Sequence, residues 1–213
     1  MKELQPSQEL LYLLAEYHRA GGVIDYALID PGAVSGNSSE IHREAAVFGL
    51  RAISAREIFP LDYRGVTIGP LTFSLPRWTW LWKRKKLTHT VSHYFWPGPE
   101  LTFHVERLKG IRIETEIFLN GSSGGNFAAK GYKGAFYDPP YPMELSALHM
   151  DSLYRSLNER LFGDWKRVDV IYNWSTDWSS YFDQGHEWWG AFLWTVQRDQ
   201  NGPIVWIGAS ASD

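Results

Sequence analysis

The stretch "RWTWLWKRKKLTHTVSHYFW", residues 77–96, alternates apolar and polar side chains over most of its length. Such alternation is typical of β-strands with one buried face. The four basic residues Lys83–Lys86 interrupt it and indicate a turn between two strands. Comparable short stretches, separated by Gly, Pro or charged residues, extend from Gly65 to Asn120. The sequence therefore predicts an antiparallel meander over about 65–120.

The register of the predicted strands follows from keeping the apolar side chains on one face, because a slip of one residue would reverse every side chain. A three-residue loop, Leu108–Gly110, aligns the apolar residues of 101–105 with those of 113–117. The opposite face then pairs Glu106 with Arg112 and His104 with Glu114, which are complementary cross-strand pairs. We interpret this opposite face as solvated.

The same register places Trp78, Trp80 and Trp82 on the apolar face. His89 and His93 lie there too, where an ionisable group is costly unless it is paired. Two interpretations follow. In the favoured one, helices cover this face and the imidazoles are neutral, hydrogen-bonded core groups. In the other, incomplete cover leaves a concave aromatic pocket for a small molecule or sugar, with these five residues as its binding residues.

Three segments have the apolar periodicity of amphipathic helices. The first is capped by Ser7 and stopped by Gly21, and the second begins near Ser38. The third runs from about Pro142 to Phe162 and ends before Gly163. The Gly- and Pro-rich stretch between the meander and the third helix is predicted to be a long loop or an irregular hairpin.

Three further strands are predicted at about 167–210, in "RVDVIYNW", "EWWGAFLWTVQR" and "PIVWIGAS". Helices before and between blocks of strands indicate an α+β fold, with an antiparallel sheet packed against two or three helices. No internal repeat or linker divides the chain. We therefore expect one domain over 1–213: a helical part at 1–60, the meander at 65–120, a helix at 142–163 and the C-terminal strands.

Composition narrows the classes of function. The chain has 213 residues and a formal net charge of -3, which argues against a general nucleic-acid-binding protein; the local basic tip is Lys83, Arg84, Lys85 and Lys86. It has no cysteine, which excludes disulfides, thiolate metal sites and a cysteine nucleophile. With no apolar run of about 18 residues and no secretion signal, we expect a cytoplasmic protein without a membrane span.

The stretch "STDWSSYFDQGHEWWG", Ser175–Gly190, is the second candidate site. Four of its residues could supply a general base with its orienting group, or metal ligands: Asp177, Asp183, His186 and Glu187. However, adjacent residues of a strand point to opposite faces, and Gly190 replaces the second histidine of the zinc-protease pattern. We favour a solvated loop before a strand.

Aromatic residues are abundant, with 11 each of Trp, Tyr and Phe, and Trp188 and Trp189 are further candidate binding residues. We expect a binding or interaction protein whose aromatic-rich surface holds a protein partner or a small ligand, as in immunity or adaptor proteins. The alternative is a hydrolase with its acid–base groups in the 175–190 loop or on the His89 and His93 face. No metal or other cofactor is expected.

Overall fold

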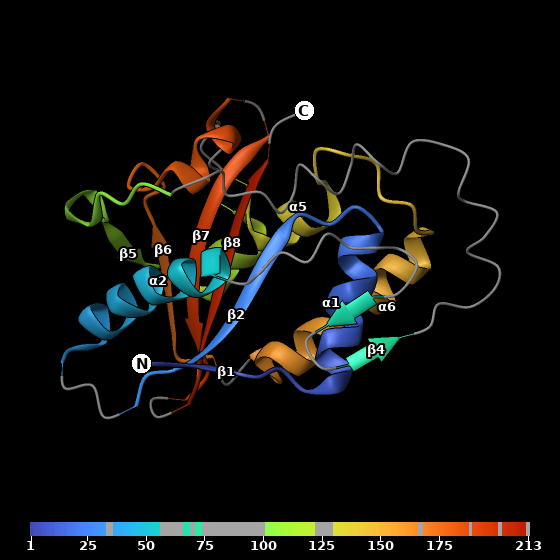
Figure 1. Ribbon diagram of the computed structural model, residues 1–213, viewed down its shortest axis with the longest axis horizontal. Helices are drawn as coiled ribbons and strands as arrows, with labels where there is room; N and C mark the ends of the chain where they lie inside the picture. The colour runs from blue at the N-terminus through green and yellow to red at the C-terminus, as the bar shows by residue number, and fades with distance from the viewer. Residues whose placement is uncertain are drawn as a thin grey trace.

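The computed structural model describes residues 1–32, 36–55, 66–68, 71–73, 101–121, 130–165, 168–187, 189–199 and 202–211. Their centre is an antiparallel sheet of six strands in the order β1-β2-β8-β7-β6-β5, which confirms the α+β class (Figure 1). Its strands are β1 (Lys2–Leu4), β2 (Ile24–Asp30), β5 (Gly110–Arg112), β6 (Val170–Trp174), β7 (Gly190–Gln197) and β8 (Ile204–Ala211). The three predicted C-terminal strands are thereby confirmed.

Helices lie on both sides of this sheet (Figure 1). The helices on one side, the α1/α6 face, are α1 (Gln8–Arg19), α4 (Thr115–Asn120), α5 (Tyr132–Tyr137) and α6 (Ala147–Phe162). On the other side, the α2 face, lies α2 (Ser38–Ala55). Along β7, Phe192 and Trp194 belong to the core of the α1/α6 face and Leu193 to that of the α2 face. The sheet therefore buries both its faces, and alternate residues of one strand enter different cores.

Two helix starts have serine caps. The Ser7 hydroxyl accepts the backbone N–H of Leu10 at 3.2 Å, and α1 and α2 begin where the sequence predicts. The third helix begins at Ala147 rather than near Pro142, because Ser146 caps it by accepting the N–H of His149 at 3.3 Å. No helix within the described ranges is both long and apolar enough to cross a membrane.

The strands predicted at 101–105 and 113–117 are wrong. In the first, Phe103 makes only an isolated bridge with Ser179, and Val105–Arg107 is a 3-10 turn. In the second, β5 ends at Arg112 and the chain turns into α4. The local hairpin does not form because β5 pairs with β6 instead, a strand far away in the sequence.

The predicted cross-strand pairs consequently do not form. His104 Nδ1 lies 3.5 Å from Oε1 of Glu106, two residues further along the chain. The Arg112 guanidinium donates to the carbonyl oxygen of Asp169 at 2.9 Å. Gly110, predicted to lie in the loop between the two strands, belongs to β5. The ring of Trp174 covers its Cα, so a side chain at this position would overlap the indole.

Other predictions need smaller corrections. The stretch "GVTIGPLTFSL" is not one strand but contains two paired strands, β3 (Val66–Ile68) and β4 (Leu71–Phe73). The predicted loop before α6 contains α5, and the sheet includes β2, for which the sequence analysis predicts no strand. The remainder of the meander, 74–100, lies outside the described residues.

Candidate functional site

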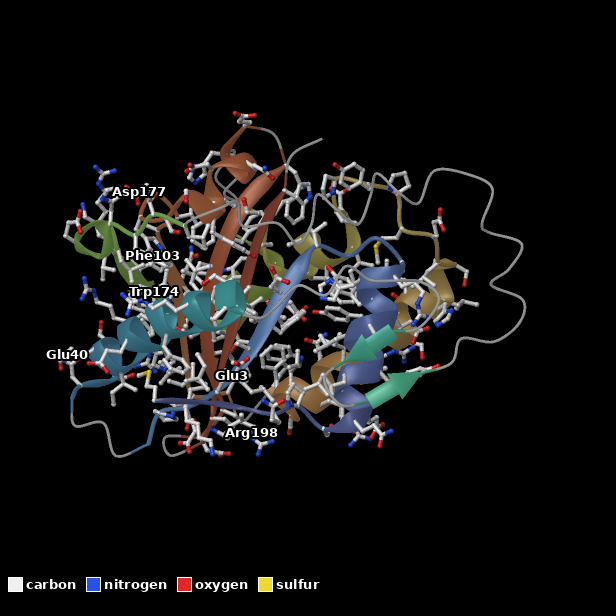
Figure 2. All side chains as sticks on the ribbon, in the orientation of Figure 1. Glu3, Glu40, Phe103, Trp174, Asp177 and Arg198 are labelled. Carbon is white, nitrogen blue, oxygen red and sulfur yellow. The ribbon has the colours of Figure 1, made fainter. Side chains whose placement is uncertain are left out.

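The segment 175–187 connects β6 to β7 and lies over one end of the α2 face. It contains two short 3-10 helices, η5 (Ser180–Phe182) and η6 (Gln184–His186). Figure 2 places Asp177 on the outer side of this region, beyond Phe103 and Trp174. This is the stretch in which the sequence predicted Asp183, His186 and Glu187 as weak catalytic candidates.

Two aromatic rings anchor the 175–187 segment in the core. Trp178 and Phe182 are both 0 % exposed, and their ring centroids lie 6.1 Å apart. Phe103 packs on the other side of Trp178 at 6.0 Å. Burying each of these rings stabilises the docked segment by about 2–3 kcal/mol.

Hydrogen bonds fix the same segment to three parts of the structure. The Tyr181 hydroxyl donates to Asp25 Oδ2 on β2 at 2.6 Å, and the backbone N–H of Gly185 donates to Ser210 Oγ on β8 at 3.0 Å. The N–H of His104 donates to the carbonyl oxygen of Trp178 at 2.6 Å. Asp25 is buried, so the Tyr181 hydroxyl partly replaces the water that its carboxylate has lost.

The polar side chains of the segment face the solvent. The exposed ones are Asp177, Asp183, Gln184, His186 and Glu187. His186 Nε2 lies 2.7 Å from Thr176 Oγ1, and no carboxylate of the described residues contacts this imidazole. The structure thus brings His186 to a hydroxyl and not to Asp183 or Glu187. This arrangement can donate and accept hydrogen bonds and attract cationic groups at an open surface.

The candidate binding residue Trp189 is buried among the residues of the α1/α6 face. Its indole N–H donates to the carbonyl oxygen of Asp138 at 2.5 Å, and Lys130 Nζ lies 6.0 Å from its ring centroid. The other predicted binding residues lie outside the described residues: Trp78, Trp80, Trp82, His89, His93 and Trp188. The basic tip Lys83–Lys86 lies outside them too.

A buried histidine that the sequence analysis did not single out joins α2 to β7. His42 is 1 % exposed; its Nδ1 lies 2.8 Å from Thr195 Oγ1 and its Nε2 lies 3.3 Å from Gln197 Oε1. The pKa of His42 is lowered from 6.5 to about 4, mainly by burial; the hydrogen bond to Gln197 opposes this shift and the positive charge of Arg112 adds to it. The signal in the sequence is spacing, because His42 precedes the buried Ala45 by one helical turn.

The sequence analysis also missed Asp25, which stands within the apolar run "VIDYALID". A carboxylate in a buried strand is costly unless it is hydrogen-bonded, and this is the signal that could have identified it. Within the described ranges, no group of three or more His, Asp or Glu side chains gathers closely enough to hold a metal ion. Comparisons of the chain with protein-family models, with curated proteins and with solved structures found no match.

Proposed function

We propose that this protein is a binding protein that recognises a protein partner through the exposed side of the 175–187 segment. The observation that carries the proposal is the contrast between the two sides of this segment. Its inner side is fixed by Trp178, Phe182 and the Tyr181–Asp25 hydrogen bond, whereas its polar side chains face the solvent. A loop that is already ordered loses less conformational entropy when a partner binds, and polar loops on rigid scaffolds often carry function.

The charge of the exposed side indicates the chemistry of the partner. Asp177, Asp183 and Glu187 provide three carboxylates, and no cation of the described residues forms an ion pair with them. Between these carboxylates, the backbone amides of Tyr181, Phe182 and His186 donate hydrogen bonds within the segment. Those of Ser180 and Gly185 donate to Thr102 and Ser210. A partner with Lys or Arg side chains at its contact surface would therefore be attracted and oriented by this side.

Acid–base catalysis has less support from the same geometry. A histidine that acts as a general base is usually oriented by a carboxylate or carbonyl oxygen, whereas His186 contacts the hydroxyl of Thr176. Its ring lies at an exposed position rather than in a closed cleft. We therefore prefer recognition to hydrolysis.

The proposal is tested by neutralising the acidic side chains of the segment in the full-length chain. The test variant combines Asp177→Asn, Asp183→Asn and Glu187→Gln, and the control combines Glu44→Gln, Glu114→Gln and Glu159→Gln. The control positions are also exposed and change the net charge equally. Proteins that co-purify with each tagged variant from the source cells are quantified by mass spectrometry, with circular dichroism to confirm folding.

We expect the test variant to lose its specific co-purifying partners and the control to keep them. The wild-type association should also weaken as salt is added, because exposed charges are screened. Equal retention of the partners by the test variant and the control would contradict the proposal. A loss of partners from the control alone would contradict it as well, since it would place recognition elsewhere.

A further inference from the structure

We propose that His42 is a proton-sensitive lock between α2 and the sheet: α2 stays docked on β7 while the imidazole is neutral and separates when the imidazole takes up a proton. This inference does not depend on the proposed binding function. It rests on the direction of the hydrogen bonds around His42, on the charges that surround it and on the other contacts of α2.

The hydrogen bonds around His42 have a fixed direction. The Gln197 amide donates to the carbonyl oxygen of Gly202 at 2.9 Å, which turns its Oε1 toward the imidazole, so His42 Nε2 carries the hydrogen. His42 Nδ1 is then an acceptor for the Thr195 hydroxyl. That hydroxyl is held in place because its oxygen accepts the indole N–H of Trp174 at 2.9 Å.

Protonation disrupts this arrangement at a defined atom. A second proton on Nδ1 turns an acceptor into a donor that faces the Thr195 hydroxyl hydrogen. The hydroxyl hydrogen must then rotate away from the imidazole and lose its acceptor, at a site where Thr195 is 0 % exposed and water cannot take the place of that acceptor. The docked arrangement of α2 is therefore specific for the neutral ring.

The charges around the site act in the same direction. From β5, the positive charge of Arg112 repels a proton on His42. Among the described residues, Arg112 is the charged group that shifts the pKa of this imidazole. From β6, the Tyr172 ring lies 4.9 Å from the imidazole, and β7 contributes only the uncharged Thr195 and Gln197. On α2 itself, the neighbouring Arg43 and Glu44 are exposed. An imidazolium at this position would have no facing carboxylate among these groups.

Release of α2 would reach the 175–187 segment through a short chain of contacts. The Arg43 guanidinium donates to the carbonyl oxygen of Val105 at 2.7 Å, and the Arg51 guanidinium carbon lies 5.6 Å from the ring centroid of Phe103. Phe103 in turn bridges to Ser179. Because α2 contacts residues 103–105, and these contact the 175–187 segment, release of α2 would also loosen that segment.

The lock is tested by hydrogen exchange of the full-length protein at a series of pH values, corrected for the intrinsic pH dependence of exchange. The released state takes up its proton with the ordinary pKa of 6.5, whereas the docked state resists until about pH 4. Docking is therefore lost as the pH falls through this window. We expect the protection of α2 amides to fall by about tenfold for each pH unit, while β7 and β8 stay protected.

Two variants and one independent measurement separate the lock from general acid unfolding. In His42→Gln, which can form both hydrogen bonds but cannot titrate, protection of α2 should lose this pH dependence. In Arg112→Gln, the docked imidazole accepts a proton more readily because a repelling charge is gone, so the protection of α2 should fall less as the pH is lowered. In the wild type, NMR should show a pKa of His42 well below the ordinary value of 6.5. Three outcomes would each overturn the proposal: simultaneous loss of protection by α2 and the sheet, an unchanged pH dependence in His42→Gln, or a pKa of His42 near 6.5 in the wild type.

Discussion

The Cα of Gly49 on α2 lies directly against the indole ring of Trp206 on β8, so that a side-chain methyl group at position 49 would overlap the ring. The Trp206 indole N–H donates to the carbonyl oxygen of Ala46, one turn earlier in the same helix, at 2.9 Å. Gly208 faces the other end of the same indole and also has no room for a side chain. Two glycines therefore allow the helix, the tryptophan and the strand to pack in close contact.

Gly49→Ala should destabilise the protein, although alanine is the better helix former. The helix would gain up to about 1 kcal/mol from the better propensity of alanine, but the overlap with Trp206 should cost about 1–3 kcal/mol and outweigh this gain. Gly134→Ala in α5 is the control, because its nearest neighbour would be Lys130 Cβ at 3.6 Å, an ordinary contact. The midpoints of urea unfolding should fall for the first variant and hold or rise for the second. Equal stability of Gly49→Ala and the wild type would show that α2 can shift away from Trp206 without cost.

Thr195→Val should be strongly destabilising although it preserves the shape of the side chain. It removes the partner of both His42 Nδ1 and the Trp174 indole N–H at a buried position. Leaving such groups unsatisfied costs about 2–4 kcal/mol in total. Thr176→Val is the matched control, because its hydroxyl also contacts a histidine, the exposed His186. The free energy of unfolding should change by less than about 0.5 kcal/mol in the control, and similar losses in both variants would contradict the prediction.

Tyr181→Phe should loosen the 175–187 segment. The hydroxyl donates to the buried Asp25 carboxylate, and a hydrogen bond to a charged group contributes about 1.5–3 kcal/mol. We expect faster proteolysis within the segment and a lower free energy of unfolding. Tyr137→Phe provides the comparison, since its hydroxyl donates to the exposed Asp151 at 2.7 Å and its loss should cost less. Unchanged proteolysis of Tyr181→Phe would show that Trp178 and Phe182 are sufficient to hold the segment.

The α1/α6 face should make the protein sensitive to alkali. Burial raises the pKa of Tyr154 to about 12, and burial also raises the pKa values of Tyr26 and Tyr132, whose hydroxyl oxygens lie 3.0 Å apart. A phenol with a raised pKa stabilises the fold below pH 10 and loses this contribution as the unfolded chain ionises. Stability should therefore fall between about pH 10 and pH 12, by about 2–3 kcal/mol from Tyr154 alone.

This alkaline transition can be followed by the ultraviolet absorbance of tyrosinate together with circular dichroism. Tyr154→Phe should make the decline in stability with pH shallower, because one shifted phenol has been removed. Tyr12→Phe is the control, since Tyr12 is 57 % exposed. Ionisation of all tyrosines near pH 10 without loss of structure would refute the prediction.

Periodicity within one segment predicted the helices and the C-terminal strands well. The stripe that contains Leu10 and Tyr17 gives α1, and both side chains are buried as this pattern requires. The stretch after Gly110 shows the limit of the method. Ile111, Ile113 and Ile117 are separated by even numbers of residues, so they would share one face of a strand. The helix α4 instead buries Phe118 and leaves Ile117 exposed. The deciding contact is the pairing of β5 with β6, which no local pattern encodes.

The candidate site was predictable as a region but not as a set of contacts. The mixture of polar residues in 175–190 predicted a loop between two apolar strands, and 175–187 does connect β6 to β7. The hydrogen bonds that fix this loop are made to Asp25 on β2 and Ser210 on β8. Both residues are distant from the loop in sequence, so no local pattern predicts these contacts. His42 escaped notice because an isolated histidine on an amphipathic helix becomes informative only when its partners are known.

The order of the strands has a consequence for biosynthesis. β2 is made before β5, β6, β7 and β8, yet its neighbour toward the centre of the sheet is β8, the last of these strands along the chain. During translation, α1, β2 and α2 cannot bury their apolar sides against β8 until Ile204–Ala211 has left the ribosome. Such long-range closure is slow and leaves the nascent chain open to aggregation. Cells that make this protein in quantity would therefore benefit from chaperones that shield its N-terminal half.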